Sequence, residues 1–268
     1  MPAIWDEKPA EDFMCIQQHR RPRRGSLTHK LLRGLADPGD AWNYLRRWTQ
    51  LARHTGLPYA ELSRYRRELR ANREFHEHLE RCLVDIEYSF SCSAELYELV
   101  RATKPRINIE TEVAAGLSSV HVLVALDANG MGMLHSIDLP NVQHGSNLPA
   151  GPAPGWMVPD GLRQRWHLHI GDSRTLLAEL LRPLHHVDLF LHDSDHSYET
   201  MLFELEHAFP KLADGGLLLS DDTQLHTAWD DFCAKHGLRP ARVFHLGVTR
   251  KPFAGASLPA TTCTASLN

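Results

Sequence analysis

The chain has 268 residues, of which 43% are hydrophobic, and a formal net charge of −4. This length and apolar content suffice for one large or two small domains with a buried core, which excludes a disordered or fibrous protein. No run of about 18 apolar residues suggests a membrane span. Residues 1–11 carry charges where a signal peptide needs an apolar segment. We therefore expect a cytoplasmic protein without a membrane partner.

The first 87 residues predict a helical extension. Asp40 is a suitable N-cap for a helix that Gly56 and Pro58 end. A longer helix is expected from Tyr59 to Ile86, where apolar residues recur at helical spacing. We assign residues 1–87 to this extension and residues 88–268 to a second domain. The extension could line a substrate pocket or form a contact in a homo-oligomer.

From residue 106 onward, short apolar runs alternate with helical segments. Strands are expected at Ile107–Ile109, Met133–Ile137, His167–Ile170, Val187–Leu191 and Leu217–Ser220, with helices such as 118–129 and 173–181 between them. This alternation predicts an α/β fold with a doubly wound, mostly parallel sheet covered on both faces. Ligands of such sheets bind outside the carboxyl ends of the strands. Function is therefore sought in the residues that follow each strand.

Three strand ends carry residues suited to a nucleotide-like ligand. After the first strand, the small residues between Glu110 and Ser119 form a turn that would let a ligand approach backbone amides. Asp138 follows the second strand, 22 residues after Gly116, where a carboxylate could accept hydrogen bonds from both ribose hydroxyls. Asp172 and Ser173 follow the third strand, where they could bind an adenine amine or simply cap the next helix.

The order of these features over residues 88–250 resembles the class I S-adenosylmethionine-dependent methyltransferases, which have a Rossmann-like fold. The resemblance implies that cofactor contacts come from Glu110, Glu112, Gly116, Ser118, Asp138, Asp172, Ser173 and Asp193. One position departs from the family pattern, which has glycine where Glu112 stands. The bulk and charge of Glu112 would weaken cofactor binding, unless the turn shifts or Glu112 contacts the cofactor's ammonium group.

Acidic residues also end the fourth and fifth strands. Asp193 follows one strand and Asp221 and Asp222 follow the other, so they converge if the strands are neighbours. Three adjacent carboxylates repel one another unless protons or a cation intervene, and oxygen ligands favour a hard ion such as Mg2+. The same acids could instead end the strands and cap the helix that follows.

These two segments resemble the metal-dependent small-molecule O-methyltransferases, which include the macrocin O-methyltransferase type. The resemblance implies that Asp193, Asp221 and Asp222 bind the metal and that Asp195 or His196 acts as the catalytic base. The base assignment stays open, because His196 and Ser197 stand where that subgroup runs directly into an aromatic residue.

The expected function is Mg2+-assisted methyl transfer from S-adenosylmethionine to a hydroxyl of a small molecule, in specialised metabolism. Two alternatives remain: an N-methyltransferase of a small amine, which needs neither metal nor base, and a degenerate binding protein. A G-x-G-x-x-G dehydrogenase motif is absent. Nucleic acid is not expected, because the basic cluster at residues 19–24 is short and the chain is acidic. The Pro- and Gly-rich stretch at 139–166 predicts a lid.

Overall fold

The computed structural model describes residues 48–82, 93–140, 153–243 and 245–254. The start of the first predicted helix, the basic cluster at 19–24, the domain boundary after residue 87 and part of the predicted lid lie outside the described residues. Within the described ranges, no helix has the length and apolar character needed to span a membrane.

An unlabelled helix over residues 48–55 comes first. The elements that follow are α3 (Tyr59–Ala71), α4 (Arg73–Cys82), α5 (Ser93–Thr103), β1 (Ile107–Thr111), α6 (Leu117–Asn129), β2 (Met133–Asp138), η1 (Asp160–Arg165), β3 (Trp166–Ile170), α7 (Ser173–Leu181), β4 (Val187–His192), α8 (Tyr198–Ala208), η2 (Phe209–Lys211), β5 (Leu212–Ser220), α9 (Ala228–Lys235), β6 (Ala241–Val243) and β7 (Leu246–Arg250).

The helix predicted as continuous from Tyr59 is interrupted at Asn72, so that prediction was wrong. Asn72 leaves the helical conformation, with φ −76° and ψ 90°, and ends α3. Its side-chain oxygen then accepts a hydrogen bond from the Phe75 amide at 3.0 Å, as an N-cap does at the start of α4. The end of the preceding helix is as predicted, because Gly56 adopts the left-handed conformation with φ +69°.

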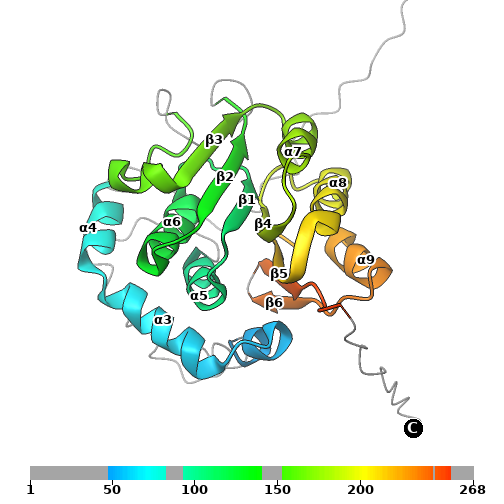
Figure 1. The fold of residues 1–268 in the computed structure, drawn as a ribbon, viewed down its shortest axis with the longest axis horizontal. Coiled ribbons are helices and arrows are strands. Elements are labelled where there is room, and N and C mark those ends of the chain that lie inside the picture. Colours follow the sequence, from blue (N-terminus) through cyan, green and yellow to red (C-terminus); the bar gives the residue numbers. More distant parts are fainter. Residues whose placement is uncertain (1–47, 83–92, 141–152, 244, 255–268) are drawn as a thin grey trace, which may run out of the picture. The chain divides into compact units, whose positions relative to one another are not determined.

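The strands form one seven-stranded sheet in the order β3-β2-β1-β4-β5-β7-β6 (Figure 1). Strands β1 to β5 run parallel, and β7 is antiparallel to both β5 and β6. This arrangement confirms the predicted Rossmann-like α/β fold and its five parallel strands. It also places β1 between β2 and β4, which is the point where the strand order reverses.

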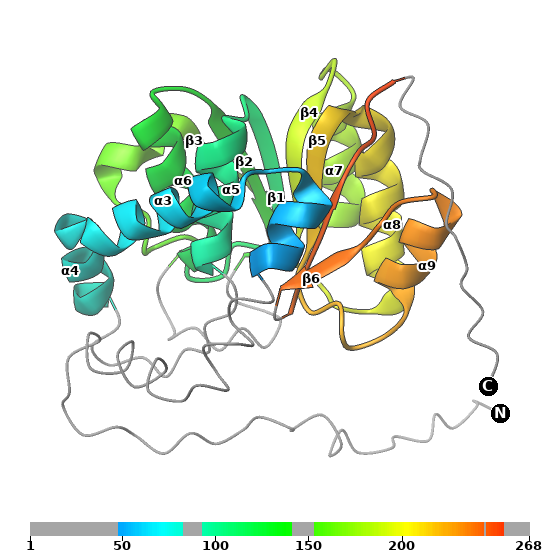
Figure 2. The same cartoon turned by 90° about the horizontal axis from the view of Figure 1, so that it is seen from below.

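Helices cover both faces of the sheet. Helices α5 and α6 lie on one face, and α7, α8 and α9 lie on the other (Figures 1 and 2). On the second face, Phe190 of β4 and Leu218 of β5 pack in one cluster with Met201 of α8 and Trp229 of α9, and all four are fully buried. Burying a side chain of this size stabilises the fold by about 1.5–3 kcal/mol. The packing therefore fixes α8 rigidly against the ends of β4 and β5.

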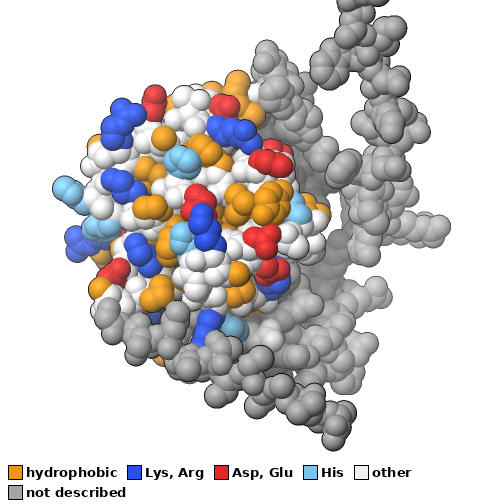
Figure 3. Space-filling model, turned by 90° about the vertical axis from the view of Figure 1, so that its right-hand side faces the viewer, with side chains coloured by type: hydrophobic (Ala, Val, Ile, Leu, Met, Phe, Trp, Pro, Cys, Tyr) orange, Lys and Arg blue, Asp and Glu red, His pale blue; other side chains and the backbone are white. Residues whose placement is uncertain are grey.

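The surface drawn in Figure 3 has a mixed character. Acidic and basic side chains are interspersed with hydrophobic ones over the coloured residues. Among the described residues on this face, no extended stripe of one charge is present.

Candidate functional site

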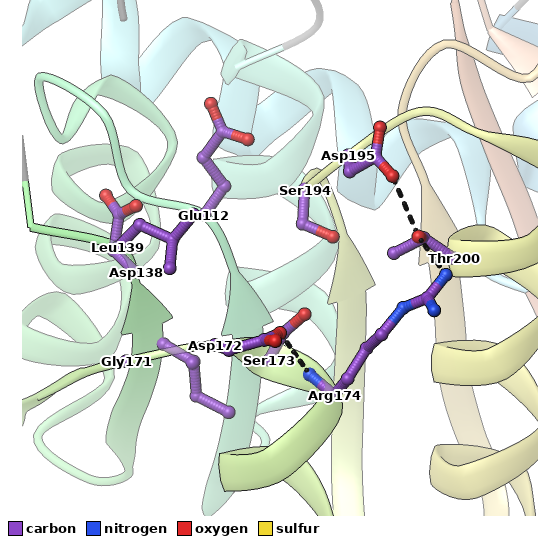
Figure 4. Close-up of a pocket in the computed structure, with 11 residues that line it drawn as sticks. Glu112, Asp138, Leu139, Gly171, Asp172, Ser173, Arg174, Ser194, Asp195 and Thr200 are labelled. Carbon is purple, nitrogen blue, oxygen red and sulfur yellow. Dashed lines mark hydrogen bonds between the residues drawn. The ribbon is translucent and has the colours of Figure 1, made fainter. Parts of the chain in front are cut away.

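A pocket of about 290 Å³ opens at the carboxyl ends of β1 to β4 (Figure 4). It is lined by Glu112, Ile137, Asp138, Leu139, Gly171, Asp172, Ser173, Arg174, Ser194, Asp195 and Thr200. Five of the predicted site residues are in this set, namely Glu112, Asp138, Asp172, Ser173 and Asp195. The pocket is therefore at the edge of the sheet where the topology favours ligand binding.

Glu110 is placed beneath the turn after β1 and is not among the residues that line this pocket. Its Oε1 accepts hydrogen bonds from Ser119 and, at 2.6 Å, from Ser136 of β2. Burial raises the pKa of Glu110 to about 7, although the Ser118 hydroxyl opposes the rise in the pKa of this carboxyl group. Its Oε2 is buried without a hydrogen-bond partner among the described residues.

Gly116 lets another segment pack closely on this turn. It is the N-cap of α6 with φ +96°, and a Cβ added there would lie 2.9 Å from the Cα of Gly155. The Gly155 amide donates to the Ala114 carbonyl at 2.9 Å, and the Met157 amide donates to the Ala115 carbonyl at 3.0 Å. The described end of the predicted lid is thus bound directly to the turn after β1.

Asp138 and Asp172 both line the pocket while holding backbone groups. The Asp138 Oδ2 accepts hydrogen bonds from the amides of Val113 at 3.1 Å and Ala114 at 2.9 Å. Burial raises the pKa of Asp138, although these amide bonds oppose the shift. The Asp172 side chain accepts a hydrogen bond from the Arg174 amide at 2.9 Å and so caps α7 while it also lines the pocket.

The structure brings Asp193 and Asp221 together. Strands β4 and β5 are neighbours, and the Asp221 amide donates to the His192 carbonyl at 2.8 Å. The two carboxyl groups share a hydrogen bond, and burial together with the charge of Asp221 raises the pKa of Asp193 well above its ordinary value. Two carboxyl groups this close are stabilised by a shared proton or a cation.

Asp222 does not join this pair. Its backbone has φ +49°, and its Oδ1 accepts a hydrogen bond from the Gln224 side chain at 2.8 Å. Across the described part of the chain, no group of three or more His, Cys, Asp or Glu residues is arranged to hold a metal ion. Of the three predicted metal ligands, Asp193 and Asp221 are therefore adjacent, and Asp222 is directed elsewhere.

The two candidate bases differ in their surroundings. The Asp195 Oδ2 accepts hydrogen bonds from Ser197 at 2.7 Å and Thr200 at 2.8 Å, and these bonds lower the pKa of Asp195. Burial lowers the pKa of His196, which keeps its imidazole neutral near pH 7. The His196 Nε2 lies 3.5 Å from the Asp222 Oδ2, and its Nδ1 is buried without a partner among the described residues.

A buried carboxylate that the sequence did not reveal as a site residue holds several strand ends. Glu204 of α8 is fully buried, and its Oε2 accepts hydrogen bonds from His192 at 2.6 Å and Thr111 at 2.5 Å. Its Oε1 accepts from Ser194 at 2.6 Å, and Ser173 also bonds to this side chain. The only sequence signal was an acid between the apolar residues that α8 buries.

Residues 109–223 match a family model described as Methyltransferase domain. A search of curated proteins gave no match. Among solved structures, the chain is similar to an S-adenosylhomocysteine-bound methyltransferase, PaMTH1, from Podospora anserina, with 12% identity, coverage of 71% of this chain and 87% of that chain, and a TM-score of 0.46.

Two further solved structures show the same level of likeness. The O-methyltransferase TomG from Streptomyces achromogenes, in complex with S-adenosylmethionine, is 18% identical over 65% of this chain and 86% of that chain, with a TM-score of 0.46. A methyltransferase from Geobacter sulfurreducens is 17% identical over the same shares, with a TM-score of 0.46. The match of residues 109–223 to this family model agrees with the expected enzyme class.

Proposed function

We propose that this domain transfers a methyl group from S-adenosylmethionine to a hydroxyl of a small-molecule acceptor, with help from Mg2+. The observation that carries the proposal is the acidic pocket at the carboxyl ends of β1 to β4, inside the stretch that matches the methyltransferase model. A cytoplasmic location and a homo-oligomer contact through the N-terminal helices remain predictions.

The donor set fits S-adenosylmethionine. Asp138 would accept hydrogen bonds from the ribose hydroxyls, and Asp172 and Ser173 would bind the adenine. Glu110, with a buried Oε2 that has no partner among the described residues, would accept from the ammonium group. Gly116 and Ser118 would shape the turn beside it. When bound, the cofactor supplies a methyl group made electrophilic by the positive sulfur.

His196 is the better candidate for the catalytic base. A base must be unprotonated at working pH, and burial keeps the His196 imidazole neutral near pH 7. Asp222 would accept a hydrogen bond from Nε2–H, which leaves Nδ1 to take the proton of the acceptor hydroxyl. Asp195 is less suited because two hydroxyl groups already stabilise its ionised form.

The pair of Asp193 and Asp221 fits Mg2+. This ion is commonly bound by one or two carboxylates and several waters, so the adjacent pair suffices and Asp222 is a third ligand only if its turn rearranges. A cation would also relieve the repulsion that raises the pKa of Asp193. When bound, Mg2+ would lower the pKa of an acceptor hydroxyl that it coordinates.

The first experiment is calorimetric titration of the full chain with S-adenosylhomocysteine, in Mg2+ and in excess chelator. We expect binding in both conditions and a separate Mg2+ heat that is lost in Asp221→Asn. Glu206→Gln, on the outer part of α8, is the matched control and should keep that heat.

Two other results would favour the N-methyltransferase or the degenerate binding protein instead. Binding of S-adenosylhomocysteine without any Mg2+ heat would remove the metal from the proposal and favour N-methyl transfer to a small amine, for which no metal is needed. Failure to bind S-adenosylhomocysteine in either condition would overturn the proposed function and favour a degenerate binding protein.

A further inference from the structure

Glu112 occupies a backbone position that favours glycine. It has φ +70°, in the left-handed region where a residue with a Cβ atom is strained. Its amide donates to the Ile137 carbonyl at 2.7 Å, so the end of β2 holds the turn in this conformation. Glycine would occupy this position without strain. The presence of a glutamate there points to a role for its carboxyl group.

The Glu112 side chain extends into the pocket from the end of β1 (Figure 4). Four acidic groups from neighbouring elements raise its pKa, namely Asp138 of β2, Asp195 after β4, Glu204 of α8 and Asp221 after β5. Together with burial, they raise the pKa of Glu112 to about 7. Arg174 is the one basic side chain among the described residues that line the pocket, and its guanidinium donates to the Thr200 hydroxyl at 2.9 Å.

This charge distribution matters because the proposed reaction changes the charge of its cofactor. Transfer breaks the bond between sulfur and the methyl carbon, and the electron pair of that bond stays on sulfur. The sulfonium cation thereby becomes a neutral thioether. An ionised carboxylate in a pocket of low dielectric distinguishes these two forms even without touching the sulfur, because Coulomb forces act over several ångströms.

We propose that Glu112 makes the pocket select its cofactor by charge, so that it favours the sulfonium form over the neutral thioether product. This inference rests on the proposed function. A glycine in the same place supplies no such discrimination. The residue that departs from the family pattern therefore acts as a specificity determinant and speeds the exchange of spent cofactor for fresh cofactor.

The test measures the dissociation constants of S-adenosylmethionine and S-adenosylhomocysteine by calorimetry at pH 8, where the Glu112 carboxylate is ionised. The variants are Glu112→Gln, which keeps the size of the side chain, and Glu112→Gly, which removes it and relieves the backbone. Glu179→Gln, an exposed residue of α7, controls for the loss of one negative charge.

We expect the unaltered chain to bind S-adenosylmethionine more tightly than S-adenosylhomocysteine. The ratio of the two constants should fall about tenfold in both Glu112 variants and stay unchanged in Glu179→Gln. The same ratio in Glu112→Gln as in the unaltered chain would overturn the inference while leaving the proposed function standing. Cofactor binding that appears only in Glu112→Gly would also overturn it, by showing that Glu112 blocks the pocket. Absence of binding by every variant would count against the proposed function itself.

Discussion

At the scale of single residues, the buried carboxylate of Glu204 organises one wall of the pocket. It joins Thr111 at the end of β1 to His192 and Ser194 at the end of β4, and it also bonds to Ser173 at the start of α7. These hydrogen bonds lower the pKa of Glu204 despite its burial. Ser173 and Ser194 line the pocket, so the carboxylate behind them sets their positions.

Replacing Glu204 with Gln should weaken both the fold and the pocket. The amide nitrogen cannot accept a hydrogen bond and the negative charge that strengthens the remaining bonds is lost, so we expect a loss of about 2–4 kcal/mol in the free energy of unfolding. Urea unfolding measures this loss, and calorimetry should show weaker binding of S-adenosylhomocysteine.

Glu206→Gln on the same helix is the control for this variant. Its carboxylate pairs with Lys235, whose side chain is 65% exposed, and with His236 at 3.1 Å, and such pairs near the surface are each worth less than about 1 kcal/mol. Equal losses in the two variants would show that Glu204 has no special structural role.

At the scale of elements, the segment 153–158 contacts the turn after β1, helix α4 and strand β3. It donates two backbone hydrogen bonds to the turn after β1, and the carbonyl of Met157 lies 2.7 Å from the His78 Nε2 of α4. Gly155 allows this contact, since a Cβ there would come within 2.1 Å of the Trp166 ring and its φ is +70°. The segment therefore supports the pocket from outside.

Gly155→Ala should detach this segment from the turn. The clash with Trp166 and the strained backbone together are expected to cost about 2–4 kcal/mol of the free energy of unfolding. Binding of S-adenosylhomocysteine should weaken in parallel. Gly161→Ala is the matched control, because a Cβ at Gly161 meets no atom within 4 Å. Thermal unfolding followed by circular dichroism compares the two, and an unchanged transition in Gly155→Ala would contradict the assigned contact.

The sequence predicted the elements well where one local pattern decides them. Short apolar runs gave all five parallel strands, because burial on both faces of the sheet requires them. The break at Asn72 was missed because apolar spacing continues across it, while the side-chain cap depends on local geometry. Strand β6 was missed because it has only three residues, and β7 was missed because it runs antiparallel to its neighbours, outside the alternation of strands and helices on which the prediction rested.

The candidate site was predictable to a similar degree. The strand ends and the contact between Asp193 and Asp221 followed from the parallel order. The direction of Asp222 did not, because it depends on one left-handed backbone angle. His192 and Glu204 were missed as a pair because their contact arises only when α8 packs on β4.

At the scale of the whole molecule, buried histidines make stability depend on pH. His121 of α6 is 7% exposed, its Nδ1 lies 2.8 Å from the Leu117 carbonyl, and burial lowers its pKa from 6.5 to about 4. Burial and two neighbouring histidines also lower the pKa of the half-buried His135 to about 4. The folded state therefore binds these protons less readily than the unfolded state does.

The contribution of His121 to the free energy of unfolding should accordingly be constant above pH 6.5 and fall as the pH drops from 6.5 towards 4. It is opposite in sign to the contribution of Glu110 and Glu112, whose raised pKa values of about 7 favour the folded state as the pH falls. A shift of this size at His121 corresponds to a loss on the order of 3 kcal/mol. Urea unfolding at a series of pH values measures the slope. The difference in free energy of unfolding between the unaltered chain and His121→Gln should change over this pH range by the contribution of His121, whereas the exposed His185→Gln should follow the unaltered chain. An unchanged slope in His121→Gln would place the pH dependence elsewhere.

The position of β1 at the centre of the sheet also has a consequence for how the chain folds. Thr111 pairs with Ile137 of β2, a close neighbour in sequence, but also with His192 of β4, which is 81 residues later. During synthesis, β1 to β3 emerge first and leave one edge of β1 unpaired until β4 has been made. Because closing such a long loop is slow, the binding edge of the sheet is among the last parts of the molecule to be completed. A truncated chain that ends before β4 would therefore expose that edge of β1 to pairing with other chains.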